Sequence, residues 1–198
     1  MSILITTSRR PTRRTRSLCN DLAKVIPGAI KVNRGKMSIK DVAARTLELN
    51  ANIAIIISVY RGNPGKIWFL YVTENSYQWI PPDILLAGVK LQREFGPIKI
   101  STPHKLAIMV SKEAEEEQKK LAESLSKILE STLIYGSPNQ ENNIVECKTK
   151  GFDIILYINS DPQFKAVLKF IQTANNIEIG PRIRIKKMFW QIKRMSET

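Results

Sequence analysis

The sequence has few of the residues on which most catalytic and metal centres depend. It contains one histidine, His104, and two cysteines, Cys19 and Cys147, in 198 residues. Two cysteines cannot supply a disulfide framework or a thiolate metal site by themselves, so we expect both to be small buried apolar groups in a reducing compartment. His104 follows Pro103 with no cysteine or carboxylate at a metal-ligand spacing, so a zinc site or a histidine-based triad lacks its other members. We expect His104 to lie in a surface loop.

Long apolar runs and nucleotide-binding signatures are absent too. No apolar segment approaches the roughly 20 residues that span a bilayer, and arginines follow the first apolar stretch too soon for a signal peptide. Neither a P-loop nor a GxGxxG fingerprint occurs, and the acidic residues gather on one predicted helix instead of converging as the carboxylates of a metal-dependent nuclease do. We expect a soluble, cytoplasmic protein that is not an enzyme, uses no metal or cofactor, and engages neither a membrane nor a small-molecule substrate.

Negative charge is scarce, and the positive excess is confined to the two ends of the chain. The formal net charge is +13, with 31 Lys and Arg against 18 Asp and Glu. Residues 1–50 hold 11 basic and 3 acidic residues, residues 180–198 hold 6 and 1, and residues 51–179 hold 14 of each. Such segregation is typical of a surface that binds polyphosphate. A membrane surface fits less well, because no amphipathic helix combines a basic face with an exposed aromatic face.

The spacing of apolar residues predicts alternating strands and helices, and so an α/β protein with mixed sheets. Helices are expected at 11–25, at 38–49 with a capping box of Ser38 and Asp41, at 112–130 with Ser111 as its cap, and at 161–172 with Ser160 as its cap. Strands are expected at 2–6, 29–32, 52–60, 66–73, 84–92, 104–111, 143–149, 151–159 and 179–194.

Two turns and the absence of a linker predict how these elements combine. Residues 61–65, RGNPG, are expected to join two strands in a central hairpin, and a second hairpin is expected about Gly151. No Pro/Gly/Ser-rich linker or low-complexity segment separates residues 1–100 from 101–198. We therefore expect a single domain spanning 1–198, in which two similar α/β halves pack on each other.

Five arginines stand where the first strand gives way to the first helix. If the helix begins near Pro11, its apolar face holds Leu18 and Leu22, and most of the arginines lie on the opposite face. Cations at a helix N-terminus oppose the macrodipole and cost about 0.3 to 1 kcal/mol each. A bound phosphate reverses this, because free N–H groups and guanidinium groups then converge on it. A solvated basic face is the alternative. The predicted RNA-binding residues of this opening cluster are Arg9, Arg10, Arg13, Arg14 and Arg16.

A second basic cluster precedes the helix that begins at Ser38. It is the predicted turn Asn33-Arg34-Gly35-Lys36, in which Gly35 permits a positive φ and a close approach of the backbone to phosphate. A polar loop with incidental charges is the alternative. Arg61, in the turn of the central hairpin, is a weaker candidate of the same kind.

The closing strand carries the third cluster. Its apolar residues fall on odd positions at Ile183 and Ile185 and on even positions from Met188, so a bulge at Lys186-Lys187 is predicted to keep the apolar side continuous. An exposed strand face without function is the alternative reading. The predicted RNA-binding residues on the other side are Arg182, Arg184, Lys186 and Lys187.

Two stretches resemble the Brix-domain family of ribosome-biogenesis factors. They are ILITTSRRPTRRTRSLCNDLAKVIPGAIKVNRGKMSIKDV and NNIEIGPRIRIKKMFWQIKRM, and the likeness covers essentially the full length. It is nearest to the compact archaeal members and to the branch that processes pre-rRNA in the eukaryotic small-subunit processome. The resemblance implies two α/β halves similar to the anticodon-binding domain of certain aminoacyl-tRNA synthetases, and binding of pre-ribosomal RNA. The residues it points to are Arg9, Arg10, Arg13, Asn33, Arg34, Gly35, Gly180, Pro181 and Arg182.

The sequence thus leads to one main functional hypothesis and two alternatives. The main one is a non-catalytic factor that binds pre-rRNA by its phosphate backbone and shape and assists rRNA processing and subunit assembly, with assembly proteins as partners. Trp79, Trp190 and Tyr60 are expected to be core or half-buried residues, so reading of unpaired bases is not expected. The alternatives are a tRNA-binding or ribosomal protein, and a protein-interaction module for acidic partners.

Overall fold

Strands hold more residues than helices in this computed structural model, which describes residues 2–96, 102–136 and 151–191. Before residue 97 the strands are β1 (Ser2–Thr7), β2 (Ala29–Lys31), β3 (Ala51–Tyr60), β4 (Asn63–Val72) and β5 (Tyr77–Lys90). After residue 101 they are β6 (Leu106–Val110), β7 (Thr132–Tyr135), β8 (Ile154–Asp161), β9 (Phe164–Gln172), β10 (Ile177–Glu178) and β11 (Arg182–Phe189). The helices are α1 (Arg13–Val25), α2 (Ile39–Glu48) and α3 (Glu116–Ile128), and a 3-10 turn, η1 (Gln92–Phe95), follows β5.

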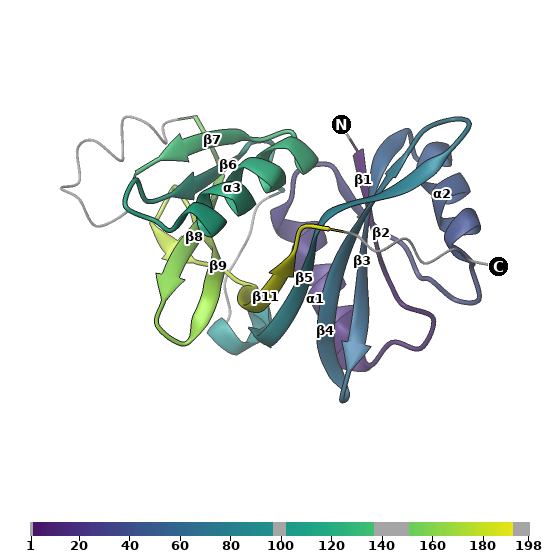
Figure 1. The fold of residues 1–198 in the computed structure, drawn as a ribbon, viewed down its shortest axis with the longest axis horizontal. Coiled ribbons are helices and arrows are strands. Elements are labelled where there is room, and N and C mark those ends of the chain that lie inside the picture. The colour runs from purple at the N-terminus through teal and green to yellow at the C-terminus, as the bar shows by residue number, and fades with distance from the viewer. Residues whose placement is uncertain (1, 97–101, 137–150, 192–198) are drawn as a thin grey trace.

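All these strands belong to one mixed sheet. Its order is β2-β1-β3-β4-β5-β11-β9-β8-β6-β7, and β10 pairs with β9. The order β2-β1-β3-β4-β5 and the order β7-β6-β8-β9-β11 share one pattern, in which the first two pairings are parallel and the next two antiparallel. The two runs meet where β5 and β11 pair antiparallel. Figure 1 shows β11, in yellow, beside the teal strand β5 at the middle of the sheet.

The main core lies on the face of the sheet that α1 and α3 share. Leu22 of α1 and Leu125 of α3 belong to the same apolar cluster as Ile55 of β3 and Leu168 of β9. On the opposite face α2 packs over β3 and β4, where Val42 is fully buried. This explains why β3 is apolar throughout, because both of its faces are covered. Each fully buried large apolar side chain stabilises the fold by about 1.5 to 3 kcal/mol.

The helix starts follow from local capping. The hydroxyl of Thr12 accepts a hydrogen bond from the backbone N–H of Thr15, so Thr12 is the N-cap of α1 and Pro11 lies just outside the helix. The predicted capping box of α2 is confirmed, because Ser38 and Asp41 each accept a hydrogen bond from the other's backbone N–H. Ser111 does not cap α3, which begins only after Glu115.

Three predictions about the elements are wrong in part. Residues 161–172 form no helix, because β9 occupies 164–172 and buries alternate residues. β5 begins at Tyr77, well before the predicted 84, and its prolines, Pro81 and Pro82, lie where the register to β4 shifts and no regular ladder is required. The hairpin predicted about Gly151 is wrong, because β8, which follows Gly151, has β6 and β9 as its two neighbours in the sheet; the strand predicted at 143–149 lies outside the described residues and stays a prediction.

The bulge predicted in the closing strand is confirmed. Ile185 pairs with Leu86 and Lys187 with Leu85, so Lys186 has no partner across from it on β5. The extra residue moves the buried positions from odd to even numbers, and Met188 continues the apolar side begun by Ile183. The strand ends at Phe189, and residues 192–198 lie outside the described residues.

Candidate nucleic-acid interface

The opening cluster lies at the edge of the sheet where the parallel strands β1, β2 and β3 have their carboxyl ends. β2 and β3 both run parallel to β1, so their carboxyl ends lie at the same edge. α1 follows β1 and α2 follows β2, and both helices therefore begin at this edge. The hairpin between β3 and β4 turns there as well, which brings Arg61 to the same edge.

Four of the five arginines in the opening cluster are exposed. Arg9 and Arg10 lie in the connection before α1, and Arg13 and Arg16 lie on the first turn of the helix. Among the described residues none of the four makes a hydrogen bond or ion pair through its side chain. The first turn of α1 has no acidic residue. These four cations are therefore available to an anion.

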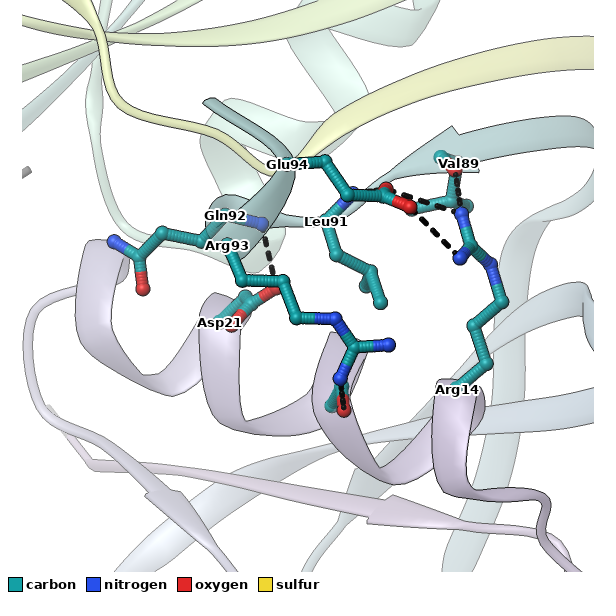
Figure 2. A network of polar contacts seen from close by, with 8 residues as sticks. Arg14, Asp21, Val89, Leu91, Gln92, Arg93 and Glu94 are labelled. Carbon is teal, nitrogen blue, oxygen red and sulfur yellow. Dashed lines mark hydrogen bonds and ion pairs between the residues drawn. The ribbon is translucent and has the colours of Figure 1, made fainter. Parts of the chain in front are cut away.

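Arg14 differs from its neighbours because it ties α1 to the end of β5. Its Nη1 and Nη2 donate to the two carboxylate oxygens of Glu94 at 2.9 and 3.1 Å, and Nη2 also donates to the carbonyl oxygen of Val89 at 2.8 Å. Figure 2 shows this side chain reaching from α1 to both partners. Arg14 was predicted to bind RNA, and the structure places it in a bidentate intramolecular contact.

A second contact joins the same two elements further along α1. The carboxylate of Asp21 accepts a hydrogen bond from the backbone N–H of Gln92 at 2.9 Å (Figure 2). Burial raises the pKa of Asp21, whereas the hydrogen bonds from Arg14 and from the N–H of Leu91 lower the pKa of Glu94. The α1 helix is thus fixed at two points to the segment that follows β5.

The turn 33–36 places its residues in different environments. Arg34 is 5% exposed, and its Nε donates to the carbonyl oxygen of Met37 at 2.7 Å. The Asn33 side-chain oxygen accepts from Lys31 at 2.6 Å, and Gly35 has φ +52°, a conformation that favours glycine. Lys36 is exposed. Within this cluster Lys36 is the outward cation, and Arg34 shapes the turn.

The tip of the central hairpin presents an aromatic side chain together with a cation. Tyr60 is 60% exposed, so its predicted burial is wrong, and the Arg61 guanidinium lies 5.3 Å from its ring centroid. Trp79 and Trp190 are half-buried, as predicted.

The closing cluster begins next to Arg14 and then crosses the sheet. Arg182 pairs with Lys90 of β5, one residue from the carbonyl that Arg14 contacts. Its guanidinium is paired with Glu178 and lies 5.6 Å from the ring centroid of Phe95. Lys186 and Lys187 are exposed further along β11. Arg184, half-buried, lies 5.8 Å from the ring centroid of Phe164.

One group of residues in this region was not predicted from the sequence. Lys66 of β4 has its ammonium group 5.7 Å from the ring centroid of Trp68 and 5.2 Å from that of Phe189. Lys187 lies 5.1 Å from Phe189 as well. The alternation of Lys66 and Trp68 in β4 places them on one face, but nothing local to that strand indicates that β11 lies two strands away, on the far side of β5.

The residues considered for catalysis are dispersed. His104 is exposed in the stretch before β6, as predicted, and its backbone N–H donates to Asp153. No group of three potential metal ligands occurs in residues 2–96, 102–136 and 151–191. Cys19 is buried against the main core, as predicted, and burial raises the pKa of its thiol to about 12; Cys147 lies outside the described residues. No described helix is long and apolar enough to cross a membrane.

Comparison with known proteins identifies the family. No family model matches the chain. A protein of Methanopyrus kandleri, described as a probable Brix domain-containing ribosomal biogenesis protein, is 32% identical over 183 residues that cover 90% of each chain. The chain belongs to the Brix-domain family of ribosomal biogenesis proteins. A Pyrococcus horikoshii relative of the same description is 30% identical over 192 residues, which cover 93% of this chain and 83% of the relative.

Solved structures agree with this Brix-domain assignment. A probable ribosomal biogenesis protein of Aeropyrum pernix K1 matches with a TM-score of 0.75 at 25% identity, covering 94% of this chain and 96% of that one. An archaeal Imp4-like protein shares the fold, with a TM-score of 0.61 at 21% identity over 95% of this chain and 99% of the other. The Brix-domain resemblance in the opening and closing stretches is thereby confirmed.

Proposed function

We propose that this Brix-domain protein is a non-enzymatic factor that binds pre-ribosomal RNA and assists its processing and assembly into subunits in the cytoplasm. The family supports a role in ribosome biogenesis, because the relatives carry that description over nearly their full length. Pre-rRNA is the proposed ligand, and other assembly proteins are the proposed partners.

The observation that carries the proposal is the group of unengaged arginines at the start of α1. Arg9, Arg10, Arg13 and Arg16 are exposed at the sheet edge where Lys36 and Arg61 also lie. In the free protein their charges oppose the helix macrodipole, and a phosphate would relieve that opposition. An arrangement that gains stability only when an anion arrives favours a binding function over a purely structural one.

The other predicted residues divide into contacts and supports in this proposal. Lys186, Lys187 and Arg184 extend the phosphate-binding surface along β11. Arg14, Arg34 and Arg182 already have partners within the protein, so we assign them to positioning the surface. Asn33 and Gly35 fix the turn that presents Lys36.

We also propose that residues 1–198 form a single domain of two related α/β units, each like the anticodon-binding domain of aminoacyl-tRNA synthetases. The support is the pairing pattern that the two ends of the sheet share. In this arrangement the units join edge to edge through β5 and β11, instead of packing face to face.

The first test removes the unengaged charge and measures binding and folding on the same sample. Arg9, Arg13 and Arg16 are replaced together by Gln, and affinity for a pre-rRNA fragment is measured beside a thermal melt. We expect affinity to fall by at least about tenfold, while Tm stays unchanged or rises slightly because the opposition to the helix dipole is removed.

A matched variant controls for the loss of charge as such. Replacing Lys105, Lys112 and Lys127 by Gln removes the same charge from exposed positions on and around α3. Equal losses of affinity in the two triple variants would show that net charge alone matters. Crosslinking in cells with sequencing of the bound RNA then identifies the ligand: precursor rRNA supports the proposal, whereas mature tRNA or no RNA contradicts it.

A further inference from the structure

Beyond the phosphate contacts, a second feature lies at the middle of the sheet on the face turned away from α1 and α3. Ile67 of β4, Ile84 of β5 and Met188 of β11 point into the main core. Their neighbours Lys66, Leu85 and Lys187 therefore point to the other face. The register places Leu85 directly between the other two, because it pairs with Lys66 on one side and with Lys187 on the other.

Two aromatic rings extend this row of side chains. Trp68 follows Lys66 on the same face of β4, and Phe189 follows Lys187 on the same face of β11. The Lys66 ammonium lies within 6 Å of both ring centroids, at 5.7 and 5.2 Å, and Lys187 approaches Phe189 to 5.1 Å. We name Lys66, Trp68, Lys187 and Phe189 the central aromatic platform.

Phe189 has the exposure and surroundings of a binding residue more than of a core residue. It is half-buried and belongs to none of the three apolar clusters of the described residues. The ammonium groups of Lys66 and Lys187 lie 5.2 and 5.1 Å from its ring centroid, and the carboxylate opposite it, Asp83, is 3.6 Å from Lys66. Trp68 differs from Phe189, because it packs at its edge against Trp79 of β5 and both tryptophans pack against the apolar cluster under α2, so Trp68 supports the platform from one side.

No described helix packs on this face of β5 and β11, since α2 covers β3 and β4. On this face Lys66 is paired with Asp83 and Arg182 with Glu178, whereas Arg184 and Lys187 have no ion pair within the described residues, so the face is complementary to an anion. Aromatic rings flanked by cations on an open sheet suit unpaired nucleotides, because bases stack on the rings and the cations bind the phosphates between them.

We propose that the central aromatic platform binds an unpaired RNA segment by base stacking on Phe189, with Lys66 and Lys187 contacting its phosphates. This inference rests on the proposed RNA-binding function and deepens it. It assigns unpaired RNA to the sheet face, whereas the arginines before and within α1 bind the phosphate backbone at the edge.

The test compares an unpaired oligouridylate with an RNA duplex of equal nucleotide number, titrated into the full chain. Phe189→Leu keeps an apolar side chain and removes the stacking surface. We expect affinity for oligouridylate to fall by about 5- to 100-fold and affinity for the duplex to change less than twofold. Tyr77→Leu is the matched control, because Tyr77 is an exposed aromatic at the far end of β5, and it should change neither affinity.

Each outcome separates the inference from the proposed function. If the wild-type chain binds neither RNA, the proposed function fails. If it binds both and Phe189→Leu leaves both affinities intact, or lowers them equally, stacking on the platform is overturned while the proposed function stands. If the Phe189→Leu variant melts at a much lower temperature than the wild type, Lys187→Gln replaces it in the test, since Lys187 is exposed. Lys187→Gln should weaken the binding of oligouridylate and lower the salt dependence of that binding by about one ion. An unchanged salt dependence would overturn the platform.

Discussion

At the scale of single residues, the five arginines between residues 9 and 16 differ in whether their side chains have partners within the protein. The Arg14 side chain has three hydrogen bonds to Glu94 and Val89, and the side chains of the other four arginines have none within the described residues. The helical spacing shows that Arg13 and Arg14 point in different directions, but the partners of Arg14 lie 75 to 80 residues away. A sequence can locate a basic cluster for this reason, whereas it cannot say which member is already engaged.

The two arginines should therefore respond differently to substitution. Arg14→Ala removes a partly buried ion pair and leaves the Val89 carbonyl without its donor, so we expect the free energy of unfolding to fall by about 1 to 2 kcal/mol. Arg13→Ala should change it by less than about 0.5 kcal/mol. Urea denaturation of both variants measures the difference, and equal effects would contradict the distinction.

Glu94 should make stability depend on pH in the acid range. Its pKa in the folded protein lies below the usual 4.5 because Arg14 and the N–H of Leu91 hydrogen-bond to the carboxylate. The folded state thus binds protons less readily than the unfolded state, so this stabilisation is complete above about pH 4.5 and is lost as pH falls through the folded pKa.

The variant Glu94→Gln isolates that contribution. It should lower stability at neutral pH and flatten the dependence below pH 4.5, and the double variant with Arg14→Ala should be less destabilised than the sum of the single variants. Asp21 contributes a slope of opposite sign, because burial raises its pKa; the Glu94 carboxylate raises that pKa further, so Glu94→Gln also makes the opposing slope of Asp21 smaller. An unchanged acid limb in Glu94→Gln would refute the assignment to Glu94.

At the scale of elements, the sequence predicts best where one pattern dominates. Ser38 with Asp41 predicts the start of α2, and the switch of apolar parity after Lys186 predicts the bulge in β11, because each signal is local. Residues 161–172 carry two patterns at once. Apolar residues at 164, 167, 168 and 171 fit a helix, whereas Ala166, Leu168 and Phe170 alternate into the main core.

Tertiary pairing decides between those two patterns. β9 bonds to β8 on one side and to β11 on the other, and a helix there would leave each of these two strands without a partner on the side that β9 occupies. The long first part of β5 was missed for a related reason. Two consecutive prolines argue against a strand in isolation, yet the register shift opposite Trp68 accommodates them.

Removal of β11 should prevent folding. The strand pairs with β5 and β9, and it buries Ile183, Ile185 and Met188 in the main core. A chain ending at Gly180 is expected to aggregate or to lack a cooperative melt, and Ile183→Ala should cost about 2 to 5 kcal/mol in the full chain. Arg184→Ala, at the next position on the outer face, is the control. A soluble truncated chain with the wild-type Tm would contradict this view of β11.

At the scale of the whole molecule, charge that is segregated at the ends of the sequence is distributed over an edge and a face of one sheet. The opening cluster lies at the edge with Lys36 and Arg61, and the closing cluster runs from that edge across the middle. The charge composition predicts that the protein binds a polyanion. The placement of the cationic residues depends on the strand order, which is set by pairings between segments distant in the sequence.

The extent of this surface can be measured by its salt dependence. If about five to eight cationic side chains contact phosphates, the logarithm of RNA affinity should fall with the logarithm of salt concentration with a slope of about −4 to −7. Replacing Arg9, Arg13 and Arg16 by Gln should reduce the magnitude of the slope by about 2 to 3. A wild-type slope of only −1 or −2 would mean that most of the exposed cations do not touch RNA.

The position of β11 also orders events during synthesis of the chain. A chain is made from its N-terminus, so β1 to β5, with α1 and its exposed arginines, leave the ribosome long before the strand that pairs beside β5. Until then β5 presents one open edge and the sheet exists as two unjoined pieces. We expect nascent chains stalled before residue 180 to resist proteolysis poorly at β5, and protection to arrive abruptly once β11 emerges. The surface that we propose to bind RNA at the middle of the sheet would then form only after β11 has left the ribosome.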